Sequence, residues 1–150
     1  MKKLPPDELA RACAKAQLES DPCVRAAGMV MEEIASGHAV FSITVTQDMV
    51  NAHGICHGGL IFTLADTAFA YACNSHNQRA VAAACEITYL NSAKLGDVLV
   101  ATAVERAHLE RIGITDVAVT LRDGTLIAEF RGHSRTVKGF LIPELARNES

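Results

Sequence analysis

The chain of 150 residues contains no tryptophan, and aromatic side chains make up only 5% of it. It also lacks an excess of positive charge, since 14 Lys and Arg residues stand against 17 Asp and Glu residues. Binding to nucleic acid or to an anionic membrane surface normally needs a basic patch, and stacking on bases needs aromatic side chains. The composition therefore argues against nucleic-acid and membrane partners.

Signals for disulfides, secretion and membrane insertion are missing as well. The five cysteines are odd in number and form no C-x-x-C pair; they are Cys13, Cys23, Cys56, Cys73 and Cys85. The two lysines near the start are not followed by an apolar stretch, so they do not begin a secretory signal. No run reaches the ~18 apolar residues that a membrane span needs. We therefore expect free thiols and a cytoplasmic location.

Motifs for phosphate and metal binding are equally scarce. The sequence has neither G-x-x-x-x-G-K-[ST] nor G-x-G-x-x-G, which excludes the common nucleotide loops. His53 and His57 lie four residues apart with Cys56 between them, a spacing compatible with zinc or with a thiol nucleophile. Because no second ligand cluster and no H-E-x-x-H follow, we expect no metal and interpret Cys56 as a small apolar residue.

The length fits one domain over residues 1–150, with a helical N-terminal segment over about residues 1–28 and a polar tail over about residues 144–150. Alternating polarity predicts a strand over residues 38–46, ahead of one long apolar helix. Four further strands are expected, at about residues 82–90, 98–107, 112–122 and 125–137. Asp123-Gly124 signals a two-residue hairpin between the last two. Short connections make an antiparallel sheet, so the expected class is α+β, with the sheet curled around the helix.

The apolar helix carries one charge in an unexpected place. Between Asp48 and Arg79, Asp66 is the single formally charged side chain. A helix that is apolar nearly all round lies in the interior, where an unpaired carboxylate costs several kcal/mol and its pKa rises. Asp66 is therefore either a structural carboxylate that caps another element or a general base or nucleophile.

The helix begins at His57-Gly58-Gly59, where the first backbone N–H groups have no partner within the helix. Glycine allows a ligand to approach these groups closely, at the positive end of the helix dipole. The segment is either an oxyanion hole or a turn required by chain geometry. Asn51 and His57, from the same loop, could orient a water or a substrate carbonyl, or could only fix the loop.

Gly58 and Asp66 are eight positions apart, which is about 12 Å along a helix. A substrate carbonyl needs its oxyanion donor and its attacking group within roughly 3 Å. One helix therefore cannot supply both to the same carbonyl. If both residues act in one reaction, the second comes from another subunit, and the protein is a symmetric dimer with two composite sites.

Basic residues recur in the last expected strand. Arg131 and Arg135 share one face with His133 between them, and Lys138 follows. This is either a solvated strand face or an anchor for a phosphorylated carrier such as the nucleotide end of coenzyme A.

Three of these segments together resemble the hot-dog-fold acyl-CoA thioesterases, and within them the phenylacetate-degradation (PaaI-type) group. The resemblance rests on Asn51-x-x-Gly54-x-x-His57-Gly58-Gly59, on Leu64-Ala65-Asp66-Thr67-Ala68-Phe69, and on Glu86-Ile87-Thr88-Tyr89-Leu90. It implies a five- or six-stranded antiparallel sheet around one helix, a homodimer that commonly pairs into a homotetramer, and hydrolysis without metal or cofactor. It also implies that Asp66 is the catalytic carboxylate, that the Gly58 N–H polarises the thioester carbonyl, and that His57 and Asn51 support it.

The resemblance further implies an acyl-CoA substrate with a small aromatic (phenylacetyl- or hydroxyphenylacetyl-type) or medium-chain acyl group. Relatives often place a Ser or Thr on the strand after the helix, where this chain has Val81-Ala82-Ala83-Ala84-Cys85. Either the polar role moves, for example to Thr67, or the acyl preference or the rate differs. Gly59 lets the substrate approach, and an acyl pocket is expected between Phe62, Phe69 and Tyr71. Two alternatives stay open, namely a non-catalytic acyl-CoA-binding or sensor protein and a hot-dog enoyl-CoA hydratase.

Overall fold

The computed structural model describes residues 3–146. The chain starts with two helices, α1 (Pro6–Glu19) and α2 (Pro22–Ala27), and continues into strands β1 (Val30–Ala35) and β2 (His38–Thr44). After a 3-10 turn (Gln47–Met49) comes the long helix α3 (Gly58–Cys73). Four strands and a short helix follow: β3 (Gln78–Tyr89), β4 (Val98–Leu109), β5 (Ile112–Leu121), β6 (Leu126–Phe140) and α4 (Pro143–Ala146).

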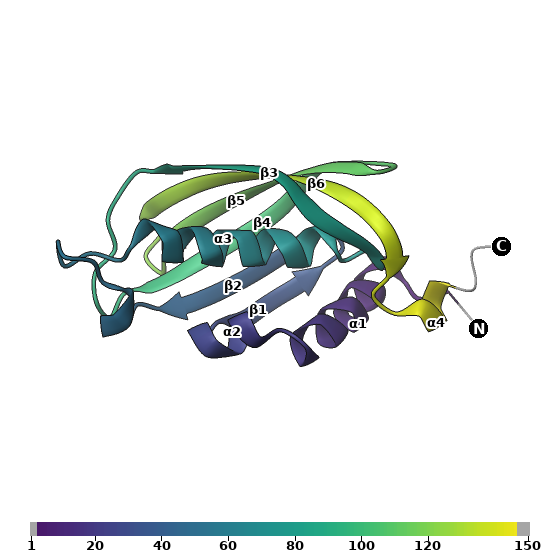
Figure 1. Cartoon of the computed structure of the whole chain (residues 1–150), viewed down its shortest axis with the longest axis horizontal. Coiled ribbons are helices and arrows are strands. Elements are labelled where there is room, and N and C mark those ends of the chain that lie inside the picture. The colour runs from purple at the N-terminus through teal and green to yellow at the C-terminus, as the bar shows by residue number, and fades with distance from the viewer. Residues whose placement is uncertain (1–2, 147–150) are drawn as a thin grey trace.

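The six strands form one antiparallel sheet in the order β1-β2-β4-β5-β6-β3, and the sheet curves around α3 (Figure 1). Helix α3 contacts all six strands, and its fully buried residues include Leu64, Ala65 and Ala68. Sheet and helix share one apolar core with Phe41, Val117 and Ile127. The expected α+β hot-dog architecture is therefore confirmed.

Among the described residues, the N-terminal segment consists of α1 and α2. The Asp21 side chain accepts a hydrogen bond from the Val24 N–H at 3.3 Å and so caps α2, whose first residue is Pro22. Gly28 ends the helix in the left-handed conformation, with φ of 70°. At the other end, α4 covers part of the expected polar tail, and residues 147–150 lie outside the described residues.

Two sequence-based predictions about the strands were wrong. Strand β1 was missed, because a register shift between Met31 and Glu33 interrupts its pairing with β2 and breaks the alternation of polar and apolar residues. The two-residue hairpin at Asp123-Gly124 is instead a longer turn over residues 122–125, closed by a Leu121 N–H to Thr125 carbonyl bond of 2.9 Å. Within residues 3–146, no helix has the length and apolarity that crossing a membrane would require.

Candidate active site

Backbone hydrogen bonds hold the start of helix α3 in place. The His57 N–H donates to the Met49 carbonyl at 2.7 Å, and the Cys56 N–H donates to the Ala93 carbonyl at 2.8 Å. The Nδ1 atom of His57 accepts the Gly59 N–H at 2.9 Å, so this side chain is the N-cap of the helix. Among the described residues, the Gly58 N–H has no acceptor and stays available to a ligand at the positive end of α3.

Asn51 organises the loop before the helix. Its Oδ1 atom accepts the backbone N–H groups of His53 at 2.9 Å and of Ile55 at 3.4 Å. The carbonyl oxygen of the side chain is therefore engaged in loop geometry, which leaves the amide NH2 as the group that can reach a ligand.

A residue of strand β3 also holds Gly58 in place. The Tyr89 hydroxyl donates to the Gly58 carbonyl at 2.8 Å. A Cβ atom at Gly58 would meet Cζ of Tyr89 at 3.0 Å, so a side chain here would press on the Tyr89 ring and shift it by a few tenths of an ångström. Sequence analysis gave Tyr89 no role, because the contact depends on how β3 lies against the start of α3.

A cavity of about 360 Å³ opens beside this junction. Its wall combines apolar side chains with a few polar groups, the composition typical of small-molecule sites. The lining residues include Asn51, Ile55, Gly58, Ile61, Tyr89 and Asn91.

Asp66 lies two turns further along α3 and is half-buried. Burial raises the pKa of its carboxyl group above the ordinary value, and no hydrogen bond or cation within residues 3–146 offsets this effect. Burial and, to a smaller extent, the charge of Asp66 raise the pKa of the Cys85 thiol on β3, so the carboxylate lies near that strand. A half-buried carboxylate without a partner fits a general base or a nucleophile better than a cap of another element.

Asp66 belongs to a stripe of α3 that the sheet does not cover. The residues of this stripe are half-buried while those on the other side of the helix are fully buried; the stripe consists of Phe62, Thr63, Asp66, Thr67 and Ala70. Strand β3, at the edge of the sheet, has a run of exposed residues from Val81 to Ala84. An exposed run without charged side chains on an edge strand is a surface for pairing with another strand.

The hydroxyl groups on the stripe are turned toward their own helix. Thr67 donates to the Thr63 carbonyl at 2.7 Å, and Thr63 donates to the Gly59 carbonyl at 2.8 Å. The Thr67 oxygen can still accept a hydrogen bond from a water or a substrate.

The acyl pocket expected between three aromatic residues needs correction. Phe69 is 1% exposed and packs on Phe130 and Gly132, where a Cβ atom would lie 2.6 Å from the Phe69 ring. Tyr71 is 2% exposed, and its hydroxyl donates to Asp21 at 2.9 Å. Neither offers surface to a substrate, because both belong to the core. Phe62 also contacts Phe130 but remains half-buried on the open stripe.

The basic residues of β6 do share the exposed face, as the alternation predicted. Arg131, however, donates two hydrogen bonds to Asp116, at 2.6 and 2.9 Å, and its guanidinium holds the pKa of that carboxyl below the usual range. Asp116 also pairs with Arg106 at 3.3 Å, so Arg131 is held in an ion pair but shares its carboxylate with a second arginine. Arg135 and Lys138 are exposed and form no ion pair with another described residue.

Three comparisons define the class. Residues 53–127 match the thioesterase superfamily. The chain is 43% identical over 131 residues to the acyl-coenzyme A thioesterase PaaI of Escherichia coli, covering 87% of this chain and 94% of that protein. The E. coli PaaI structure, from the phenylacetic acid degradation operon, superimposes with a TM-score of 0.89 at 41% identity over 91% of this chain and 99% of that one.

A second solved structure contains a ligand. A protein from Streptococcus mutans, solved with acetyl-CoA bound, superimposes with a TM-score of 0.72 at 28% identity over 75% of this chain and 90% of that chain. This chain belongs to the thioesterase superfamily, in its PaaI-type branch with the hot-dog fold, and is a thioester hydrolase.

Proposed function

We propose that the protein hydrolyses acyl-CoA thioesters at a site shared by two subunits, with Asp66 of one chain and the Gly58 N–H of the other acting on the same carbonyl. One observation carries the proposal: both groups lie on α3 without a partner among the described residues, about 12 Å apart along the axis. Two α3 helices running antiparallel in a symmetric dimer would bring each carboxylate to the start of the other helix.

The two groups have complementary roles in hydrolysis. The ionised Asp66 takes a proton from water, which attacks the thioester carbonyl, or it attacks the carbonyl itself to form an anhydride. Negative charge then develops on the carbonyl oxygen, where the partner subunit's Gly58 N–H and its helix dipole stabilise it. Collapse of the tetrahedral intermediate breaks the C–S bond and releases the CoA thiolate. In the water route the thiolate takes the proton held by Asp66; in the anhydride route water then hydrolyses the anhydride, which releases the acid and restores the carboxylate. The reaction needs water as its second substrate, and the proposal assigns no metal or cofactor to it.

The uncovered surfaces of the chain support the dimer. The exposed run on β3 and the half-buried stripe on α3 both flank Asp66, and one partner subunit placed along β3 would cover them together. His57 fixes the geometry of the amide group as N-cap, and the amide of Asn51 orients the water or the carbonyl. Pairing of two dimers into a tetramer is a further part of the proposal.

The acyl group is proposed to be small and aromatic, of the phenylacetyl or hydroxyphenylacetyl type, or of medium chain length. Support comes from the cavity of about 360 Å³ beside Gly58, whose wall includes Ile55, Ile61 and Tyr89, and from Phe62 on the open stripe. The PaaI relative is named as an acyl-CoA thioesterase, and the Streptococcus protein binds acetyl-CoA. Arg135 and Lys138 are proposed to bind the CoA phosphates.

Release of free CoA from a panel of acyl-CoA esters, followed with a thiol reagent, tests the proposal. Wild-type protein should hydrolyse phenylacetyl-CoA, and Asp66→Asn should lower kcat by roughly 10²–10⁴-fold, the usual loss for a general base. The exposed Asp48 gives the control, since Asp48→Asn should retain wild-type turnover. Near-normal turnover of Asp66→Asn would exclude the assignment.

A further inference from the structure

A second group of reactive side chains lies beyond the C-terminal end of α3, far from Gly58. His76 belongs to the turn that follows the helix, and Glu105 and His108 come from the end of β4. His76 Nε2 lies 2.7 Å from Glu105 Oε1, and His108 Nδ1 lies 3.5 Å from Glu105 Oε2. One nitrogen or oxygen atom from each of the three side chains lies within 4.8 Å of the other two.

The carboxylate in this cluster is buried, but only one of its two oxygen atoms forms a hydrogen bond within residues 3–146. The Glu105 side chain is 8% exposed, and its Oε2 atom has no hydrogen-bond partner among the described residues. A buried carboxylate oxygen without a donor is costly, and native structures normally supply a donor or a cation. The unpartnered oxygen lies on the side of His108, where a cation would satisfy it.

The backbone around Glu105 holds this carboxylate in place. The Glu105 N–H donates to the Gly37 carbonyl at 2.8 Å, and the Gly37 N–H donates to Ser75 Oγ at 2.8 Å. Ser75 precedes His76, so the same contacts fix both ligand-bearing segments. The spacing of the potential ligands is therefore set by the fold rather than by flexible surface side chains.

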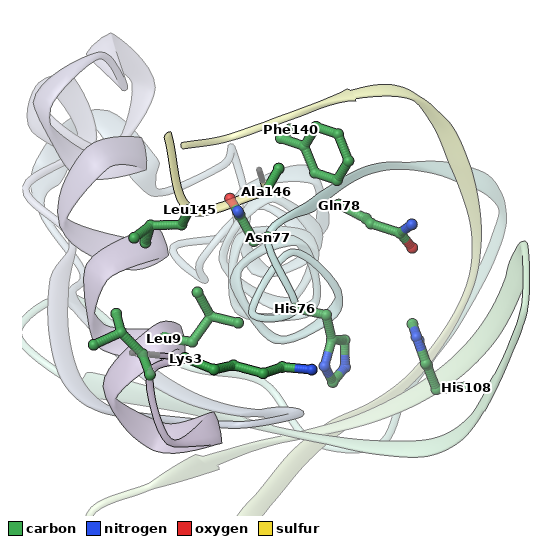
Figure 2. A pocket seen from close by; sticks show the side chains of 10 residues that line it. Lys3, Leu9, His76, Asn77, Gln78, His108, Phe140, Leu145 and Ala146 are labelled. Atoms are coloured by element: carbon green, nitrogen blue, oxygen red, sulfur yellow. The ribbon is translucent and has the colours of Figure 1, made fainter. Parts of the chain in front are cut away.

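The site borders a cavity. A cavity of about 250 Å³ is lined by His76 and His108, and Figure 2 shows the two side chains approaching one another from different elements. The centroids of the two imidazole rings are 4.2 Å apart. The negative end of α3, three residues before His76, favours a cation here. The ammonium group of Lys3 also points toward His76 and opposes a cation, but Lys3 is exposed and its charge is screened by salt.

We propose that His76 Nε2, the Glu105 carboxylate and His108 Nδ1 bind one divalent transition-metal ion of the Zn²⁺ type, with water from the cavity as the fourth ligand. Two imidazoles and a carboxylate suit Zn²⁺, whereas Ca²⁺ and Mg²⁺ prefer oxygen ligands throughout. Bonds of about 2.0–2.2 Å in a tetrahedron separate neighbouring ligand atoms by roughly 3.3 Å. The His108–Glu105 separation is close to this value. The shorter His76–Glu105 pair, now joined by a proton, would widen when the metal replaces that proton.

The metal would connect the turn after α3 to β4 and would not take part in hydrolysis. Asp66 and the cluster are separated along the axis of α3, because the helix continues for seven residues beyond Asp66, about 10 Å. Among the described residues this is the one group of three or more metal-ligating side chains close enough to share an ion. His53, His57 and Cys56 do not form such a group, and His57 Nδ1 is occupied by the Gly59 N–H.

Equilibrium dialysis of the EDTA-treated protein against Zn²⁺ tests the proposal. Wild type should bind one Zn²⁺ per chain, and His108→Gln should weaken binding at least tenfold. The His108 side chain is 38% exposed and makes no hydrogen bond to another described residue, so this variant should fold. Glu105→Gln is the second variant and should weaken binding as well. His38→Gln is the matched control, because His38 pairs with Glu33 at 3.1 Å but has no second histidine beside it. It should bind Zn²⁺ like wild type.

Two further measurements exclude other sources of binding. At free Zn²⁺ about 100 times Kd, the Tm should rise by about 5–10 °C in wild type and not in His108→Gln. Co²⁺ bound at the site should give the strong visible absorption of a four-coordinate ion without a thiolate charge-transfer band. Absence of Zn²⁺ binding to wild type, equal binding by His108→Gln, or loss of binding in Cys23→Ser, which removes an exposed thiol, would each overturn the proposal.

Discussion

The hydroxyl of Tyr89 donates a 2.8 Å hydrogen bond to the carbonyl of Gly58, and this contact joins the end of the edge strand β3 to the first residue of α3. The amide group proposed to stabilise the oxyanion therefore sits on a residue held by the same strand that is proposed to pair with the partner subunit. In the proposed dimer, subunit pairing and the geometry of the amide group would therefore be coupled through one side chain.

Tyr89→Phe should weaken catalysis without removing any reacting group. The variant loses one hydrogen bond, which is worth about 0.5–1.5 kcal/mol, so kcat should fall by roughly 2–10-fold. KM should change less, because the ring that lines the cavity is retained. Steady-state kinetics on phenylacetyl-CoA measure both, and an unchanged kcat would show that Gly58 is positioned without this bond.

Gly58→Pro should remove the proposed oxyanion donor itself. Proline has no N–H, is favoured at the first helical position, and accepts the extended conformation of His57, which has ψ of 133°. Loss of an oxyanion donor usually lowers kcat by about 10²–10³-fold. The matched control is Gly58→Ala, which brings the same Cβ contact with Tyr89 but keeps the N–H. If the two variants are equally active, the amide group has no catalytic role.

Asp66→Asn should stabilise the protein at neutral pH while lowering its activity. Burial raises the pKa of Asp66 in the folded state, so folding favours the protonated carboxyl. That contribution is fully present below the unfolded value of ~3.9 and is lost as the pH rises through the folded pKa. The Tm of Asp66→Asn should exceed that of wild type at pH 7, and the difference should shrink toward pH 4. A lower Tm at pH 7 would mean that a partner stabilises the carboxylate.

The raised pKa of Asp66 should also appear in the pH dependence of wild-type kinetics. Since the general base acts in its ionised form, kcat/KM should fall on acidification with a midpoint above the ~3.9 of a free aspartate. A midpoint at or below that value would contradict the burial argument.

Arg135→Ala should raise KM for acyl-CoA more than Arg131→Ala does. Arg135 is exposed and free of ion pairs within the described residues, whereas Arg131 is held by Asp116. Removing one phosphate contact should raise KM severalfold with little change in kcat. A short acyl thioester without the nucleotide should show no difference between the variants. A larger effect of Arg131→Ala on KM would reverse the assignment.

Sequence reasoning identified α3, its isolated carboxylate and its Gly-Gly entrance, because these depend on local pattern. The roles of residues that depend on tertiary contacts could not be predicted in this way. A helix that is apolar nearly all round does not reveal which side meets the sheet, so Phe69 and Tyr71 were assigned to a pocket although they are in the core. Tyr89 was missed because its contact with Gly58 spans 31 positions, and the pairing of Arg131 with Asp116 depends on the β5–β6 register.

The most direct measurement of the composite site is complementation between Asp66→Asn and Gly58→Pro chains. Each homodimer lacks one essential group at both sites and should be nearly inactive. A heterodimer carrying two different tags combines the intact Asp66 of one chain with the intact Gly58 of the other at one of its two sites. It should recover about half the kcat of the wild-type dimer. A doubly tagged dimer no more active than its parents would place both groups in one chain's site and contradict the account.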